Sequence, residues 1–400
     1  MKVLQINSVC GIRSTGRICT DIADVLRENG DECKVAYGRE SVPKQYEDIA
    51  FRIGNDNDVK LHALASRAFD TAGFHSKRAT RSLLKYIDEF SPDIIHLHNI
   101  HGYYLNVELL FDYLKERNLP VVWTLHDCWS FTGHCSHYAS VGCEKWKSGC
   151  YSCPQKGEYP ASLFLDGSKR NYERKKSAFC GIKNLTVVTP SEWLAEETRK
   201  SFLGEYRVVA IPNGIDTEVF KPTESDFRER YGLENKKIIL GVATAWSEKK
   251  GLSKFIKLAD LLGDDYKIVL VGLAEEQRVD IPKEILGLTR TNSAKELAEI
   301  YSAADLCVSL SEEETMGLTV VEANACGTPS MVFNKTALPE LIGDKNGAVV
   351  NRTDMHDVCD EIKGLCSESF SHEDCVDHAA CYEKQKMYQK YIDLYKEIVK

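Results

Sequence analysis

The chain has 400 residues, 43% hydrophobic and 28% charged, with a net charge of −9. The length predicts two domains, and the negative charge excludes a general nucleic-acid binder that uses a basic surface. No apolar run approaches the roughly 20 residues of a membrane-spanning helix, and the start, MKVLQINSVCG, lacks the long apolar core of a signal peptide. We therefore expect a cytoplasmic protein with reduced thiols.

Strand-like apolar runs alternate with helical patterns along the first half of the chain. A helix is expected near residues 16–29, after the first run. The runs are KVLQINS, CKVAYG, DIIHLHN, VVWTLHD, LTVVTPS and YRVVAIPNG. This alternation predicts a parallel sheet flanked by helices.

The second half restarts the same alternation. Its runs are KKIILGVAT, YKIVLVGLA, DLCVSLS, PSMVFN and GAVVN. Two such series predict an α/β protein with two Rossmann-like doubly wound domains. In open α/β sheets ligands bind at the carboxyl ends of the strands, so we expect the site in a cleft between the two domains.

The domain boundary is expected where prolines and an Asn-Gly turn interrupt the pattern, in IPNGIDTEVFKPTESD. The linker is placed at 212–225. It separates an N-terminal domain at 1–211, with a Cys-rich insert at 128–160, from a C-terminal domain at 226–380. The last segment, 381–400, is expected to be a helix that packs back on the N-terminal domain.

The loop CGIRSTGRI follows the first strand. Gly11 and Gly16 give it freedom, and Ser14 or Thr15 could cap the next helix. The start of that helix could face a donor diphosphate or an acceptor. Loops of this kind are common in α/β folds, so the signal alone is not specific.

Residues 60–87, KLHALASRAFDTAGFHSKRATRSLLKYI, mix basic and apolar side chains. Such a stretch could touch a membrane surface. It is more often a packed helix with a solvated basic face, and that is the interpretation we favour.

His126 ends the strand-like run VVWTLH, which places its ring at a carboxyl end and toward the expected cleft. The alternative is a hydrogen-bonded core histidine. His98 also ends a run, and for it a site-lining role and a structural role are equally open, as they are for His96 and His101.

Five cysteines crowd into CWSFTGHCSHYASVGCEKWKSGCYSCP. Cys150 and Cys153 have the spacing of a chelating pair, and Cys135 and Cys143 could complete a tetrahedral structural zinc site. A long irregular insert needs something to fix it.

Two alternatives to this ligand set remain open. His134 and His137 could replace thiol ligands, and the thiols could instead be reduced and packed with Trp129 and Trp146. An iron–sulfur cluster is disfavoured because nothing in the sequence suggests redox work.

The stretch SEEETMGLTVVEANACGTP places two carboxylates, Glu314 and Glu322, on either side of a glycine. The N–H groups of Gly317, Leu318 and Thr319 at the expected helix start form an anion site. A diphosphate between two polyols would fit, with Glu322 on ribose hydroxyls and Glu314 on sugar hydroxyls. The ligand would be a nucleotide sugar. The alternative is that both acids are ordinary exposed residues.

Lys250, in EKKGLSKF, follows a strand and opens a helix. A lysine there can reach a diphosphate as a point charge and stabilise the leaving nucleotide. The alternative is a solvated lysine beside Lys249.

The segment SEEETMGLTVVEANACGTPSMVF resembles the donor-binding segment of glycosyltransferase family 4, whose E-x7-E motif matches Glu314 and Glu322. Nearly the whole chain is similar to the family in the expected order. The other similar segments are VVTPSEWL, IPNGIDTEVFKP, SEKKGL and AEIYSAADLCVSLS. STGRI, HDCWSFTGHC and the Cys-rich insert resemble a subgroup that builds bacterial exopolysaccharides, including colanic-acid-type enzymes.

The resemblance implies the GT-B fold and transfer of a hexose, with retention, from a UDP- or GDP-sugar to a glycan or lipid-linked glycan. In that fold the N-terminal domain, 1–211, would be the acceptor side, and the C-terminal domain, 226–380, would bind the nucleotide sugar. It implies no metal or cofactor for the chemistry. It also implies catalytic roles for His126, Lys250 and Glu314. One departure is that Thr244 and Ala245 occupy the region of a family arginine, and Lys249 could supply the second positive charge.

The sequence also allows three rival interpretations. Asp56-x-Asp58 resembles the metal motif of the other major glycosyltransferase fold, but it lies in a polar loop and is rejected. An epimerase or a phosphorylase could share the frame, although no pyridoxal-phosphate lysine motif is present. A non-catalytic binder of nucleotide sugar or glycan, which regulates polysaccharide assembly, is the remaining alternative. Contact with the inner face of a membrane stays open.

Overall fold

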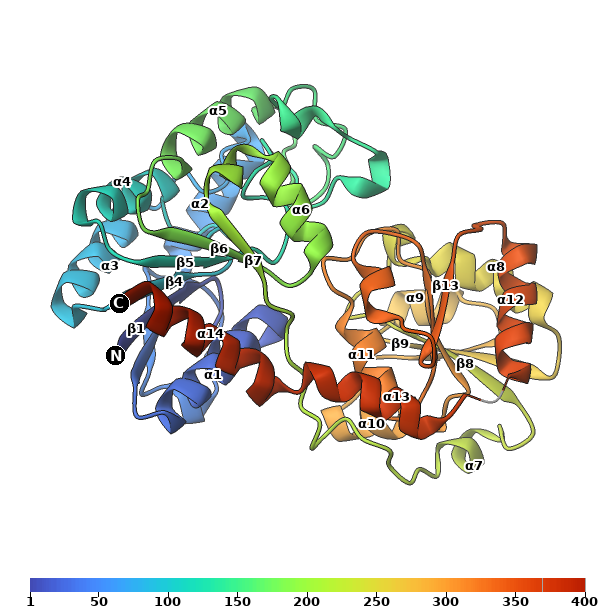
Figure 1. Cartoon of the computed structure of the whole chain (residues 1–400). Helices are drawn as coiled ribbons and strands as arrows, with labels where there is room; N and C mark the ends of the chain where they lie inside the picture. The colour runs from blue at the N-terminus through green and yellow to red at the C-terminus, as the bar shows by residue number, and fades with distance from the viewer. Residues whose placement is uncertain (369, 400) are drawn as a thin grey trace. The chain divides into compact units, whose positions relative to one another are not determined.

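The computed structural model describes residues 1–368 and 370–399. The chain divides into two compact units (Figure 1). Unit 1 contains Met1–Pro212 and the residues from Met387 onward, and unit 2 contains Asn213–Lys386. Each unit is built on its own sheet, and each is described here by itself.

Unit 1 is a seven-stranded sheet in the order β3-β2-β1-β4-β5-β6-β7, with every neighbouring pair parallel. Its strands are β1 (Lys2–Asn7), β2 (Glu32–Tyr37), β3 (Ala50–Arg52), β4 (Ile94–Leu97), β5 (Val121–Thr124), β6 (Leu185–Thr189) and β7 (Arg207–Ala210). Its helices are α1 (Arg13–Glu28), α2 (Asp56–Phe69), α3 (Lys77–Phe90), α4 (Val107–Arg117), α5 (Ser168–Phe179) and α6 (Glu192–Lys200). The central strands β4 and β5 are buried along their whole length, as expected where helices cover both faces of a parallel sheet.

Unit 2 is a six-stranded parallel sheet in the order β10-β9-β8-β11-β12-β13. Its strands are β8 (Lys237–Val242), β9 (Tyr266–Val271), β10 (Ile285–Leu288), β11 (Leu306–Ser309), β12 (Ser330–Phe333) and β13 (Gly347–Val350). Its helices are α7 (Phe227–Tyr231), α8 (Leu252–Leu262), α9 (Glu275–Asp280), α10 (Ala294–Ala303), α11 (Leu318–Ala325), α12 (Met355–Ser367) and α13 (His372–Ala379).

The strand order has the same logic in both sheets. Each chain segment begins in the middle of its sheet, winds to one edge, and then crosses back to build the other half. The reversal lies between β1 and β4 in unit 1 and between β8 and β11 in unit 2. The predicted fold class, two Rossmann-like doubly wound α/β domains, is confirmed, and each sheet has the switch point at which such folds bind ligands.

The last helix, α14 (Lys384–Val399), completes the core of unit 1. Its Tyr388, Tyr391 and Tyr395 are buried there. The Tyr395 hydroxyl hydrogen-bonds His96 Nδ1 at 2.6 Å, and the Tyr391 hydroxyl lies 3.1 Å from Thr124 Oγ1. The end of the chain is thereby fixed to β4 and β5, beside the switch point of unit 1.

Among the described residues, no helix combines the length and the apolar character that crossing a bilayer requires.

Candidate active site

The predicted site residues follow the strands at the two switch points. In unit 1, His98 comes after β4 and His126 after β5. In unit 2, Lys250 comes after β8 and Glu314 after β11. Because the carboxyl ends of parallel strands share one sheet edge, the order of the strands groups these side chains within each unit.

Glu314 and Lys250 form an ion pair in unit 2, with Lys250 Nζ 2.5 Å from Glu314 Oε1. Ser311 Oγ donates to the same oxygen at 3.1 Å, and the Glu314 backbone N–H donates to Thr336 Oγ1 at 2.9 Å. Both charged side chains are about one-quarter exposed, at 32% for Lys250 and 20% for Glu314. The pair is therefore preformed yet accessible to a ligand.

Gly317 sets the start of α11. It is the N-cap of the helix with a φ of 101°, and a Cβ there would lie 2.8 Å from Leu338 Cδ2. Only glycine fits both constraints comfortably. Leu318 and Thr319 are the first residues of the helix, where backbone N–H groups and the helix dipole favour an anion.

Glu322 lies on the second turn of α11 and is half-buried. Its Oε2 accepts a hydrogen bond of 3.0 Å from the hydroxyl of Tyr301, which is fully buried on α10. The tyrosine fixes one carboxylate oxygen, so the Glu322 side chain is held in place about one turn beyond the N-cap Gly317.

Lys249 lies beside Lys250 in a short turn, Glu248–Lys250, and is half-buried. Its carbonyl accepts a hydrogen bond of 2.9 Å from the Glu312 N–H. The loop after β8 is thus tied to the loop after β11. Unit 2 brings together the predicted residues Lys249, Lys250, Glu314 and Gly317 through these two loops.

His126 heads a chain of hydrogen bonds in unit 1. Its Nε2 lies 3.1 Å from His98 Nδ1, and the two rings meet edge to edge in nearly parallel planes, with an interplanar angle of 10°. His98 Nε2 in turn lies 2.9 Å from Gln5 Oε1. The Gln5 amide then donates to the Cys19 carbonyl at 2.7 Å. The His126 ring is therefore oriented by a line of residues from three neighbouring strands.

Burial keeps this histidine group neutral. It lowers the pKa of His126 to about 4, with nearby Asp127 opposing the shift and His101 adding to it. Burial likewise lowers the pKa values of His96 and His98 well below the usual range. At neutral pH the site in unit 1 offers uncharged rings that donate and accept hydrogen bonds.

His96 and His101 have different partners. His96 is fully buried between Thr124 and Tyr395, which makes it structural. His101 Nε2 contacts Asp127 Oδ2 at 2.8 Å. Burial acts to raise the pKa of Asp127, but the His101 ring and hydrogen bonds, one of them from the Trp129 N–H, lower it to about 2. Asp127, directly after His126, is a charged neighbour that the sequence analysis did not consider.

The prediction that Ser14 or Thr15 caps the first helix is wrong. The helix begins at Arg13, with Ile12 as its N-cap and no side-chain capping bond, so Ser14 and Thr15 lie within its first turn. Gly16 is buried inside α1, where a Cβ would lie 3.1 Å from Val9 Cγ2. Its smallness thus permits close packing of α1 against the loop after β1.

The four predicted zinc ligands, Cys135, Cys143, Cys150 and Cys153, line one small cavity of about 10 Å³ in the insert of unit 1. The Gly133 N–H donates to Cys150 Sγ at 3.1 Å. A hydrogen bond between the thiols lowers the pKa of Cys153 to about 6 and raises that of Cys135.

The insert also has an aromatic core, in which Trp146 packs on Phe131 and Tyr138 with ring centroids 5.1 and 5.0 Å apart. Within residues 1–368 and 370–399, no three His, Cys, Asp or Glu side chains are placed to hold a metal ion. The observed arrangement is that of packed thiols that form no disulfide with one another. Zinc stays a prediction, which metal analysis of the purified protein and of Cys153→Ser would test.

Several partners of the candidate residues in unit 1 and in unit 2 could not be found from sequence patterns. Tyr301 and Gln5 are separated from Glu322 and His98 by 21 and 93 residues. Only Gln5 could have been noticed locally, because it is a polar residue within the apolar run KVLQIN of strand β1.

Two known protein families together match almost the entire chain. The family described as Glycosyltransferase Family 4 matches residues 15–219, and the family described as Glycosyl transferases group 1 matches residues 223–380. The first match alone covers just over half of the chain.

Curated relatives carry related names. The chain is 24% identical over 324 residues to the putative colanic acid biosynthesis glycosyl transferase WcaC of Escherichia coli K12, covering 77% of each protein. It is 27% identical over 239 residues to the N-acetyl-alpha-D-glucosaminyl L-malate synthase of Bacillus anthracis, covering 55% of this chain and 62% of that enzyme.

Solved structures share the fold. Sucrose-phosphate synthase from Thermosynechococcus elongatus superposes with a TM-score of 0.71 at 15% identity, covering 99% of this chain and 98% of the other. Anabaena Alr3699/HepE in complex with UDP gives 0.68 at 16% identity, covering 99% and 100%. These likenesses show the GT-B fold. Taken with the family matches, they establish that the chain belongs to glycosyltransferase family 4 and is a glycosyltransferase.

Proposed function

We propose that the protein transfers a hexose, with retention, from a UDP- or GDP-sugar to a glycan or lipid-linked glycan acceptor in polysaccharide assembly. The observation that carries the proposal is the arrangement in unit 2. Glu314 and Glu322 flank the helix start at Gly317, and Lys250 lies against Glu314. This arrangement offers a cation and N–H groups for a diphosphate, with a carboxylate for hydroxyls on either side.

Two similar proteins support the proposed donor class and the proposed role in polysaccharide assembly. Alr3699/HepE has been crystallised with UDP and with UDP-glucose. The relative from Escherichia coli is named for colanic acid biosynthesis. Both properties belong to those proteins and are carried to this chain as a proposal.

Lys250 would change partners when the donor binds. In the structure its charge is balanced by Glu314. A diphosphate at the start of α11 would attract Lys250 Nζ, and Glu314 would become available for the hydroxyls of the sugar. As the bond to the anomeric carbon breaks, Lys250 and the N–H groups of α11 would stabilise the charge on the leaving phosphate.

His126 would act on the transferred sugar as a neutral hydrogen-bonding group. Its pKa of about 4 keeps it uncharged at neutral pH, and His98 holds its ring. For retention without a protein nucleophile, the leaving phosphate oxygen would accept the proton of the acceptor hydroxyl. The acceptor oxygen would form its bond on the face that the phosphate leaves.

A thermal-shift screen of UDP-, GDP- and ADP-sugars tests the donor. A ligand that binds the folded state raises the melting temperature by mass action. Glu322→Gln is the appropriate variant, because it retains an acceptor for the buried Tyr301 hydroxyl while losing the charge. Glu361→Gln, on the exposed face of α12, is the matched control.

We expect one nucleotide sugar to stabilise the wild type and Glu361→Gln, and to stabilise Glu322→Gln much less. Release of nucleotide in the presence of acceptor would then establish turnover. Affinity without release would favour the non-catalytic binder, for which the absence of an arginine at Thr244 and Ala245 is the supporting feature. A shift of the wild type with a glycan but with no nucleotide or nucleotide sugar would contradict the transferase proposal.

A further inference from the structure

Helix α2 of unit 1 has its polar and apolar faces reversed. Its buried residues are His62 and Ser66, and the buried Asp70 follows at the C-cap. These positions are four apart and lie on one face. In contrast, Leu61 and Leu64 are 66% and 67% exposed. A surface helix normally buries its apolar stripe, so this reversal requires an explanation.

The buried polar face is held by specific hydrogen bonds. His62 Nδ1 lies 2.9 Å from Ser76 Oγ, and the Gly73 N–H donates to His62 Nε2 at 3.1 Å. At the other end, Asn55 and Asp58 form a capping box that fixes the helix start. These contacts set the rotation of α2, and with it the outward position of the two leucines.

A second apolar segment adjoins the end of α2. Leu163, Phe164 and Leu165 are consecutive and exposed, with Phe164 at 74%. The Leu163 N–H donates to the Arg67 carbonyl on α2 at 2.8 Å. Proximity to the helix is therefore built into the backbone of this loop.

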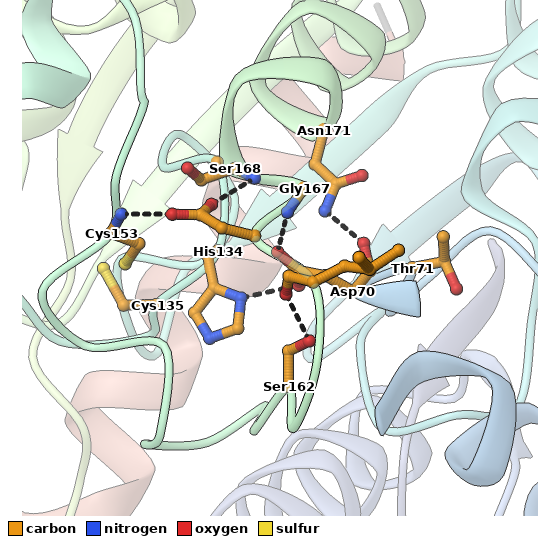
Figure 2. A network of polar contacts seen from close by, with 12 residues as sticks. Asp70, Thr71, His134, Cys135, Cys153, Ser162, Gly167, Ser168 and Asn171 are labelled. Atoms are coloured by element: carbon orange, nitrogen blue, oxygen red, sulfur yellow. Dashed lines mark hydrogen bonds and ion pairs between the residues drawn. The ribbon is translucent and has the colours of Figure 1, made fainter. Parts of the chain in front are cut away.

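Asp70, at the end of α2, fixes the same loop through hydrogen bonds. Its carboxylate accepts hydrogen bonds from His134 Nδ1 at 2.6 Å and from the Gly167 N–H at 2.7 Å (Figure 2). Its carbonyl accepts from the Asn171 amide at 2.6 Å. Figure 2 shows Asp70 at the centre of this network. The exposed loop is thus a fixed part of the surface beside α2.

Together these side chains form what we call the α2–loop patch. Half of the twelve large hydrophobic side chains that the described residues expose belong to it. Its members are Leu61, Leu64, Phe69, Leu163, Phe164 and Leu165. Exposed apolar residues gathered in this way mark an interaction surface.

Positive charges surround the patch. Lys60 and Arg67 lie on α2, Lys169 and Arg170 follow the loop, and all four are exposed. Arg170 also donates to the Phe69 carbonyl at 2.9 Å, which places its guanidinium next to the patch.

The nearby acids have partners of their own. Asp166 accepts from the Cys153 and Ser168 N–H groups at 2.6 and 2.9 Å. Asp56 pairs with Arg52. Backbone N–H groups leave the charge of Asp166 in place, but one such carboxylate against the four exposed cations leaves the charge beside the patch mainly positive.

We propose that the α2–loop patch seats in the interfacial layer of an anionic lipid bilayer and makes this chain a peripheral membrane protein. Apolar side chains that enter the acyl boundary, together with a rim of Lys and Arg that contacts anionic headgroups, are the two elements such surfaces combine. The patch belongs to unit 1 and the donor residues belong to unit 2, so the proposal does not rest on the transferase proposal.

The charge pattern disfavours a second copy of this chain as the occupant. A two-fold symmetric interface would place the same patch on both copies. It would bring the rim of Lys60, Arg67, Lys169 and Arg170 against itself, and like charges in contact repel.

Vesicle flotation of the full chain tests the proposal. One set of vesicles contains phosphatidylcholine alone, and the other also contains phosphatidylglycerol. We expect the protein to float with the anionic vesicles, and added salt to weaken the binding. Phe164→Asp should reduce the bound-to-free ratio about tenfold or more. Arg67→Gln should reduce it about fivefold on anionic vesicles.

Val279→Asp is the matched control, because Val279 is 81% exposed on α9 of unit 2, outside the patch. Its binding should equal that of the wild type. All three positions are exposed, so melting temperatures should be unchanged and lost binding would not report lost folding.

Three outcomes would overturn the proposal. The first is that the wild type floats with neither vesicle. The second is that it floats and Phe164→Asp floats equally well. The third is that the wild type ignores vesicles but self-associates in light scattering, and that Phe164→Asp abolishes the association. In that case the patch is an interface between copies. None of these outcomes would bear on whether unit 2 binds a nucleotide sugar, which the thermal-shift screen tests separately.

Discussion

The two units place their candidate residues in opposite electrostatic environments. In unit 1, His126 and His98 contact each other through ring nitrogens at strand ends, and burial keeps them neutral. In unit 2, Lys250 and Glu314 carry opposite charges in partly exposed loops. Both arrangements are hydrogen-bonded without a ligand. They differ in whether a ligand must break an existing contact: a diphosphate would separate Lys250 from Glu314, whereas the histidine rings can stay as they are.

The difference follows from the cost of burying charge. A buried imidazole avoids that cost by remaining unprotonated, so unit 1 can fix its rings permanently. Lysine and glutamate stay charged by pairing where water still reaches them. Unit 1 thus offers rigid neutral groups, and unit 2 offers a charged pair that a diphosphate can separate. Four changes would break or sharpen this contrast, from the largest expected effect to the smallest.

Lys250→Ala should lower kcat for nucleotide release by about 10²- to 10³-fold, as loss of a group that stabilises developing charge does. The assay is turnover of the donor identified by the thermal-shift screen. Lys257→Ala, at an exposed position on α8, is the matched control and should retain activity. Equal activity of the two variants would remove Lys250 from the chemistry.

Acidification should destabilise unit 1. The unfolded chain protonates His126 near its ordinary pKa of 6.5, whereas the folded protein does so only near 4. The stability contribution is therefore complete above pH 6.5 and is lost as the pH falls from 6.5 to 4, by about 2–3 kcal/mol.

Urea unfolding at pH 7 and pH 5 measures this loss, with tryptophan fluorescence as the signal, because four of the five tryptophans lie in unit 1. His126→Gln should show a smaller dependence on pH. His356→Gln, exposed on α12, should behave as the wild type. An identical pH dependence in all three proteins would contradict the assignment.

His126→Ala should lower kcat about 10²-fold with little change in donor affinity, since the ring acts on the transferred sugar rather than on the nucleotide. In the wild type, His126 should cause no loss of activity between pH 8 and pH 6, because its pKa is about 4. A fall centred near pH 6.5 that disappears in the variant would show an ordinary, solvated histidine instead.

Tyr395→Phe should have the smallest effect, a loss of about 1–2 kcal/mol in the unfolding of unit 1. It removes the hydroxyl that contacts His96 Nδ1 at 2.6 Å and leaves a buried nitrogen without that partner. Tyr151→Phe, at a 58% exposed position, is the control and should be neutral. A neutral Tyr395→Phe would mean that water replaces the hydroxyl.

The sequence was informative where the signal is local. In residues 306–329, the pattern of an apolar run, a loop and a short helix predicts that Glu314 follows a strand and that Glu322 lies in the helix. The structure has Glu314 after β11 and Glu322 within α11. The two-domain α/β class followed from the repeated alternation of apolar runs. The partners Tyr301 and Gln5 could not be foreseen, because pairing across 21 or 93 residues leaves no local pattern.

Residues 60–87 show where periodicity fails. The favoured interpretation, a packed helix with a solvated basic face, holds for α3, which buries Leu83 and Ile87 and exposes Lys77 and Arg81. For α2 it is wrong. Its rotation is decided by hydrogen bonds of His62 to Ser76 and Gly73, which lie on other segments.

The tyrosines of α14 have a consequence for synthesis on the ribosome. The core of unit 1 includes Tyr388, Tyr391 and Tyr395, yet these are translated only after all of residues 213–386. Until then, the pocket beside His96 and Thr124 lacks its last aromatic layer. The first unit to be made should therefore be the last to reach full stability, and nascent chains halted before residue 388 should expose this surface to chaperones and proteases.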